Sequence, residues 1–168
     1  SYIKVRDSTI SNNDDKAIKI NEGSVLDVKD STITGKSGKN AIAGFNKSMM
    51  FLAEDDGTTL ISTTNADAIV LINSHGEIRG GVTVTSNTKG IHLAISSINI
   101  EVGATVNGSS NGGSIVGQML STIEISHGST VSSPVWCGTD NTTTVFLMSQ
   151  SGNYPSTTIG DNCKTLRF

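Results

Sequence analysis

The chain has 168 residues and a formal net charge of −3, and only 16% of its residues are charged and 4% aromatic. This length suits one domain with a substantial core. The weak negative charge, with no basic stripe, argues against nucleic-acid binding, and no apolar run approaches the roughly 20 residues of a membrane-spanning helix. Turn-forming and β-branched residues outnumber strong helix formers, and Ile, Val and Leu recur regularly, so we predict an ordered all-β chain.

A short phrase returns along the whole chain: Thr, then an aliphatic residue, then in most copies a small polar residue. The copies begin at Thr9, Thr32, Thr59, Thr83, Thr105, Thr130 and Thr158, at steps of 22 to 28 residues. The polar–apolar–polar alternation predicts a strand with one buried face. Self-similarity at this period is typical of a repeat protein in which each unit stacks on the last.

Two further strand-like columns recur at the same period. One, a small residue followed by Ile, covers 17–20, 41–43, 68–71, 90–93 and 114–116, and the other covers 26–28, 50–52, 78–80, 98–100 and 123–125. Equivalent strands follow each other by one full circuit, so they must be parallel neighbours. We therefore predict a right-handed parallel β-helix of about seven coils with three short strands each. It forms one domain over residues 1–168, and we expect residues 135–168 to act as a cap.

The columns predict stacked side chains. The expected inner ladders contain Ile18, Ile42, Ile69, Ile91 and Ile115, with Ile98 over Ile123 and Ile100 over Ile125. Asn tolerates left-handed backbone, and the residues expected near the corners of the coils are Asn12, Asn13, Asn40, Asn65, Asn87 and Asn111. The longest circuits predict insertions at 54–56 and 152–155.

The two cysteines, Cys137 and Cys163, lie 26 residues apart, which is about one circuit. We expect them in the same column on adjacent coils, within disulfide range. Two buried free thiols are the alternative. The disulfide is the prediction because solenoids rich in Ser, Thr and Asn are usually exported.

The outward threonines are candidates for a contact face. They are Thr32, Thr34, Thr83, Thr85, Thr105 and Thr130. Such an array can bind a protein, a glycan, ice or another copy of the same face. The plain alternative is that Thr simply suits a solvent-facing strand.

Residues with catalytic or metal-binding chemistry do not converge in the sequence. The outward row of the second column mixes signs and an aromatic residue, as Asp27, Phe51, Arg79, Asn99 and Glu124. The acidic run 54–56 lacks the spacing of an EF-hand loop, which leaves a solvated turn as the ordinary explanation. The three histidines, His75, His92 and His127, lack metal-ligand spacing, and there is no Gly-x-Ser-x-Gly elbow. We expect His75 and His127 to lie in turns before Gly, and His92 to lie on a strand and point outward. We expect no catalytic site, no cofactor and no metal.

With the repeats aligned, stretches such as 21–35 (Asn-Glu-Gly-Ser-Val-Leu-Asp-Val-Lys-Asp-Ser-Thr-Ile-Thr-Gly) resemble the passenger domains of bacterial autotransporters. These are β-helices of the pertactin-like or pectin-lyase-like kind. The resemblance implies an extracellular location at the bacterial surface, anchored through a downstream outer-membrane barrel. It also implies a role in adhesion, biofilm formation, host contact or virulence. Since strand-like residues follow Ser1 at once, we expect this chain to be a fragment of a longer passenger.

These observations predict a surface adhesin that acts by contact rather than by chemistry. The expected partner is another copy of itself, or a host or cell-surface protein or glycan. The alternatives are a β-helix that binds or degrades polysaccharides and, third, an ice-binding protein.

Overall fold

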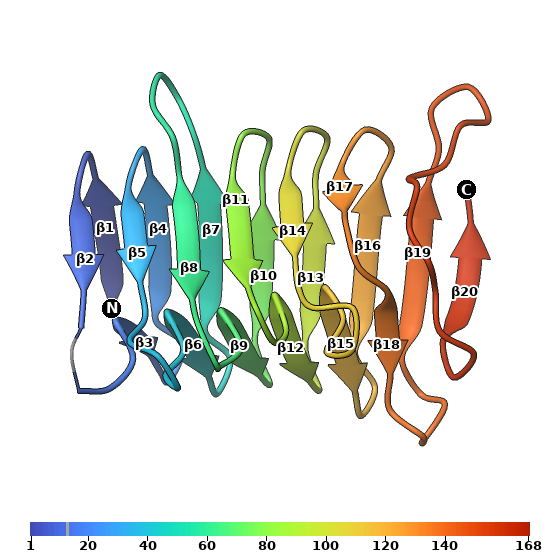
Figure 1. Cartoon of the computed structure of the whole chain (residues 1–168), viewed down its shortest axis with the longest axis horizontal. Coiled ribbons are helices and arrows are strands. Elements are labelled where there is room, and N and C mark those ends of the chain that lie inside the picture. Colours follow the sequence, from blue (N-terminus) through green and yellow to red (C-terminus); the bar gives the residue numbers. More distant parts are fainter. Residues whose placement is uncertain (13) are drawn as a thin grey trace.

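A computed structural model describes residues 1–12 and 14–168. The described chain is all-β, and its three parallel sheets stack into a solenoid of about seven coils (Figure 1). Asn13, one of the expected corner residues, lies outside the described residues. The predicted all-β parallel solenoid is confirmed.

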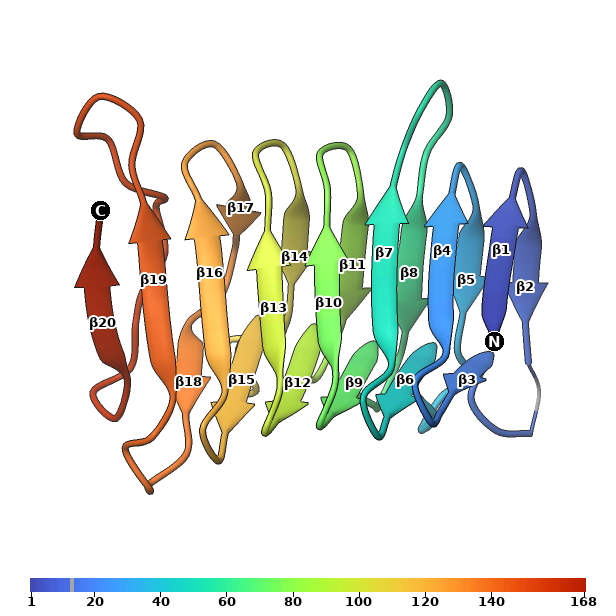
Figure 2. The ribbon, with the colours of Figure 1, turned by 180° about the vertical axis from the view of Figure 1, so that it is seen from behind.

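The strands of each sheet come from successive coils. Sheet A, seen in front in Figure 2, contains eight strands: β1 (Tyr2–Arg6), β4 (Val25–Lys29), β7 (Met49–Ala53), β10 (His75–Ile78), β13 (Ser97–Ile100), β16 (Thr122–Ser126), β19 (Thr144–Met148) and β20 (Lys164–Arg167). Sheet B contains β2 (Thr9–Ser11), β5 (Thr32–Thr34), β8 (Leu60–Thr63), β11 (Thr83–Ser86), β14 (Thr105–Asn107) and β17 (Thr130–Val131). Sheet C contains β3 (Ile18–Ile20), β6 (Ile42–Phe45), β9 (Ile69–Ile72), β12 (Ile91–Ala94), β15 (Ile115–Gln118) and β18 (Val135–Cys137).

The core is the inside of this tube. In sheet C the predicted Ile ladder is in register from Ile18 to Ile115, and its members from Ile42 onward are fully buried. In sheet A, Ile98 pairs with Ile123 and Ile100 with Ile125, as predicted. Each buried aliphatic side chain contributes about 1.5–3 kcal/mol, so these ladders hold the coils together.

The predicted register is wrong at two strands. In β10 the residue that pairs with Phe51 and Asn99 is Glu77, not Arg79. The inward position before it is Gly76, and a Cβ there would lie 2.6 Å from Ile98 Cδ1, so neighbouring side chains fill the space. Because Gly76 has no side chain, it gives no hydrophobic signal in the sequence. The repeat pattern therefore predicted Ile78 at this inward position instead.

In β8 the residue level with Thr32 and Thr83 is Leu60, not Thr59. Thr59 is fully buried, and its hydroxyl donates to the carbonyl of Ala53. The longer loop that precedes β8 shifts the Thr phrase by one residue, and a one-residue slip reverses which face a side chain occupies.

The seventh Thr phrase, at 158–160, does not form a strand of sheet B. Ile159 bridges to Val135 and so continues sheet C. The predicted disulfide between Cys137 and Cys163 is confirmed, with a Cα–Cα distance of 5.2 Å. Cys163 precedes β20 instead of lying in sheet C, so the bond ties the turn before the last strand to β18.

The corners carry the left-handed residues that close each coil. Asn65 has a φ of 56°. The backbone N–H of Asn65 donates a hydrogen bond to the side-chain oxygen of Asn87 at 2.6 Å. At the corner between sheets C and A, the left-handed residues include Asn46 and Asn73 in earlier coils and Ile95 in a later one. Asn adopts this conformation readily, whereas a β-branched residue such as Ile does so rarely.

Candidate functional site

The outward side chains of sheet B form a surface that we call the hydroxyl face. One row contains Thr9, Thr32, Leu60, Thr83, Thr105 and Thr130, and the next contains Ser11, Thr34, Ser62, Thr85 and Asn107. All six predicted contact residues therefore lie on this face. No residue of the six strands is charged.

Both rows of the hydroxyl face run along the solenoid axis at the inter-strand spacing of about 4.8 Å. Each hydroxyl is both a donor and an acceptor. Thr34 Oγ1 and Ser62 Oγ lie 3.4 Å apart, so hydroxyls of neighbouring coils contact each other. A depression of about 400 Å³ lies at the edge of this face and is lined by residues that include Thr34, Ser62, Thr85 and Asn87. Such a face can offer a periodic set of uncharged hydrogen-bonding groups.

Outward charges gather instead on sheet A. Arg6 Nη2 lies 2.6 Å from Asp27 Oδ2, and the Tyr2 hydroxyl donates to the same oxygen at 2.9 Å. Burial alone would raise the pKa of Asp27, but the hydrogen bonds from Arg6 and Tyr2 outweigh it and hold that pKa below its usual value. Asp27 is therefore a paired structural carboxylate.

The corrected outward row of sheet A reads Asp27, Phe51, Glu77, Asn99 and Glu124. Phe51 and Asn99 separate the three carboxylates, so acids on adjacent coils do not face each other in this row. Arg79 lies beyond the end of β10 and pairs with Glu77 at 3.0 Å. Within residues 1–12 and 14–168, no three His, Cys, Asp or Glu side chains gather in a way that could hold a metal ion.

On sheet C, His92 points outward as predicted and contacts a carboxylate. Its Nδ1 lies 3.0 Å from Asp67 Oδ2, and Lys89 Nζ lies 3.5 Å from the same carboxylate. Burial pushes the pKa of Asp67 upward, but the hydrogen bond with His92 and the charge of Lys89 give a net pKa below the usual value. This carboxylate therefore stabilises the fold in its ionised form.

We expect Asp67→Asn to lower the free energy of unfolding at pH 7 by about 1–2 kcal/mol, because hydrogen bonds to charged groups contribute about that much. The native pKa is lowered, so the contribution is fully present above the unfolded pKa of about 3.9 and disappears as the pH falls through the native pKa. Urea titrations from pH 7 to pH 2 should show the two proteins converging at acid pH. Asp14→Asn, on an exposed side chain, is the matched control. A constant difference over the whole pH range would contradict this account.

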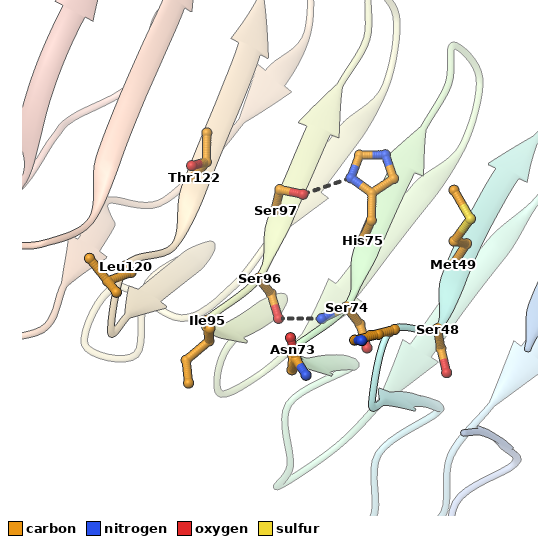
Figure 3. Close-up of a pocket in the computed structure, with 11 residues that line it drawn as sticks. Ser48, Met49, Asn73, Ser74, His75, Ile95, Ser96, Ser97, Leu120 and Thr122 are labelled. Atoms are coloured by element: carbon orange, nitrogen blue, oxygen red, sulfur yellow. Dashed lines mark hydrogen bonds between the residues drawn. The ribbon is translucent and has the colours of Figure 1, made fainter. Parts of the chain in front are cut away.

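A second polar contact lies at the corner between sheets C and A, in a pocket of about 440 Å³ (Figure 3). His75 Nδ1 lies 2.7 Å from Ser97 Oγ, and His75 Nε2 lies 3.7 Å from Glu77 Oε1. The prediction that His75 belongs to a turn is wrong: it is the first residue of β10 and its side chain faces outward. His75 and Ser97 are 22 residues apart, one circuit, so the correct register would have brought them together.

Comparisons with family models, with curated proteins and with solved structures find no match for this chain. The fold itself defines the class: a parallel β-solenoid stabilised by a disulfide. None of the described residues belongs to a helix long and apolar enough to cross a membrane.

Proposed function

We propose that this chain is a segment of a bacterial surface adhesin of the autotransporter passenger type, and that it acts by contact through the hydroxyl face. The observation that carries the proposal is the alignment of uncharged hydroxyl rows along sheet B, while charged side chains gather on sheet A. A solenoid repeats the same groups at constant spacing, so many weak hydrogen bonds form together. The disulfide supports an exported protein, because such bonds persist in oxidising compartments.

The favoured partner is a second copy of the chain. A hydroxyl row is self-complementary, because each group both donates and accepts, and a two-fold contact brings the same patch from both copies together. With no charge on the strands of sheet B, two copies meet without like-charge repulsion.

Three Glu residues placed on the hydroxyl face should abolish self-association. We expect bacteria that display a variant with Thr83→Glu, Thr105→Glu and Thr130→Glu to stop clumping, because the buried carboxylates would repel each other and lose water. The readout is the settling rate of displayed cells, with surface expression measured in parallel.

The matched control places three Glu residues on the outward face of sheet A, as Val25→Glu, Ser126→Glu and Thr144→Glu, and so has the same net charge. This control should clump like the wild type. Unchanged clumping of the sheet B variant would refute the proposed contact face.

Polysaccharide binding is the second candidate function, and the depression beside Thr34, Ser62 and Thr85 favours it, because its hydroxyls suit a neutral glycan. Incubation with neutral and acidic glycans followed by product analysis separates binding from cleavage. Retention of a neutral glycan by the wild type that is lost in Thr34→Glu would support this function.

Ice binding is the third candidate function. Leu60 interrupts the row of threonines that would have to match an ice surface. A measurement of thermal hysteresis tests ice binding.

A further inference from the structure

We propose that Ser97, His75 and Glu77 form a site that hydrolyses short-chain carboxylic esters, with Ser97 as the nucleophile. The site lies on sheet A, at the corner with sheet C, and is separate from the hydroxyl face (Figure 3). It does not depend on the proposed adhesive function. The proposal departs from the sequence-based expectation that the chain carries no catalytic site.

The sheet itself holds the nucleophile against its base. Ser97 and His75 are paired in register on β13 and β10, and their side chains leave the same face of sheet A. The Nδ1–Oγ distance of 2.7 Å is within hydrogen-bond reach of a general base. A serine that donates to a histidine is the arrangement that activates a hydroxyl for covalent catalysis.

Glu77 lies two residues beyond His75 on the same face and strand, and its Oε1 is 3.7 Å from His75 Nε2. A proton on Nε2 faces this carboxylate and leaves Nδ1 free to accept the Ser97 proton. Arg79 Nη2, 3.0 Å from Glu77 Oε2, holds the carboxylate from its other side. Glu77 is thus a positioning residue that favours the required tautomer and would stabilise the imidazolium.

The reaction balances with water as the only co-reactant. Ser97 Oγ attacks the ester carbonyl carbon while its proton passes to His75 Nδ1. The carbon–oxygen bond to the alcohol then breaks, and the alcohol leaves with that proton. Water next gives a proton to His75 and its oxygen attacks the acyl carbon, which releases the acid and returns the proton to Ser97.

The pocket beside Ser97 also contains a further hydroxyl group and an apolar surface. Thr122 is in register with Ser97 on the strand opposite to His75 and lines the same pocket (Figure 3). Ile95 and Leu120 line the same pocket and are 47% and 71% exposed. Both have left-handed backbone, with φ of 52° and 61°.

The corner tolerates Asn in earlier coils, so the fold does not require exposed apolar residues in this strained conformation. Strained residues cluster at functional sites, and here they would contact an apolar acyl group. The other carboxylate–histidine pair lacks such an arrangement, because His92 Nε2 is buried and has no hydrogen-bond partner. The pocket beside His75 and Ser97 therefore suits esters with short acyl groups.

The test uses the full chain, a fluorophosphonate probe and p-nitrophenyl butyrate. We expect the probe to label Ser97, located by peptide mass spectrometry, and His75→Asn to remove the label. Ser97→Ala should reduce ester hydrolysis at least 100-fold, since a general base with its nucleophile contributes roughly that factor or more. Ser126→Ala, an outward serine of the same sheet, should retain full activity.

Glu77→Gln should lower kcat about 10-fold and leave KM unchanged, because it acts through His75 and not on the ester. Leu120→Ser should lower the rate on the butyrate ester relative to the acetate ester. Circular dichroism of each variant checks that the sheet is intact. Absence of label at Ser97, or hydrolysis by Ser97→Ala at the wild-type rate, would overturn the proposal.

Discussion

Replacing Ile91 by Ala should lower the free energy of unfolding by about 3–5 kcal/mol. Ile91 is fully buried and lies between Ile69 and Ile115 in the inner ladder of sheet C. The truncation loses the transfer free energy of the removed carbons and leaves a cavity that the stacked coils above and below cannot close. Equilibrium unfolding in urea, followed by circular dichroism, measures the effect.

The matched control is Thr83→Ala on the outward side of sheet B, which should change stability by no more than about 0.5 kcal/mol. A loss below about 1 kcal/mol for Ile91→Ala would mean that this ladder is not the core of the solenoid.

Removing the disulfide should be comparably damaging. The bond closes a segment of 26 residues, and the chain-entropy model gives about 3.5 kcal/mol for a loop of that length. It ties the segment that leads to β20, a strand whose four residues are all exposed and which, among the described strands, pairs only with β19. The double variant Cys137→Ser/Cys163→Ser is therefore expected to unfold at a lower urea concentration.

Wild-type protein treated with a reductant should match the double variant, and hydrogen exchange should quicken chiefly in 144–167. Equal stability of the oxidised wild type and the double variant would show that the last coil holds without the bond.

The inner ladders could be predicted because their signal is strong and periodic. From Ile18 to Ile115 the same residue type returns in every coil of sheet C, and each copy is preceded by a small residue or Gly. Side chains that stack on their equivalents favour one residue type in each row, so the repeat in the sequence reports the register directly. The disulfide could be predicted for the same reason, because Cys137 and Cys163 are 26 residues apart, which is about one circuit of the solenoid.

The register failed where a residue carried no hydrophobic signal or where a loop changed length. Gly76 is an inward residue, and the side chains of Met50 and Ile98 fill the space beside it. Because Gly carries no hydrophobic signal, the repeat pattern predicted Ile78 at this position. The loop before β8 displaced the Thr phrase by one position, which put Leu60 on the outward face. Both errors are one or two residues in size, yet they decide which chemistry the surface shows.

The two candidate sites differ in whether a periodic sequence signal reveals them. The hydroxyl face could be located from the sequence because Thr recurs with the period of the coils. The contact between His75 and Ser97 could not, because each occurs once in its row and only the correct register of β10 and β13 brings them together. The left-handed conformation of Ile95 was equally hidden, since it runs against the preference of a β-branched residue.

The most direct test of the account is the distance between spin labels at Thr9→Cys and Thr130→Cys, in a chain whose native cysteines remain bonded. These positions lie at the two ends of the outward row of sheet B, separated by five inter-strand steps. At about 4.8 Å per step, pulsed electron paramagnetic resonance should give a single narrow distribution near 24 Å. A broad distribution, or one centred beyond about 35 Å, would contradict the stacking on which every site described above depends.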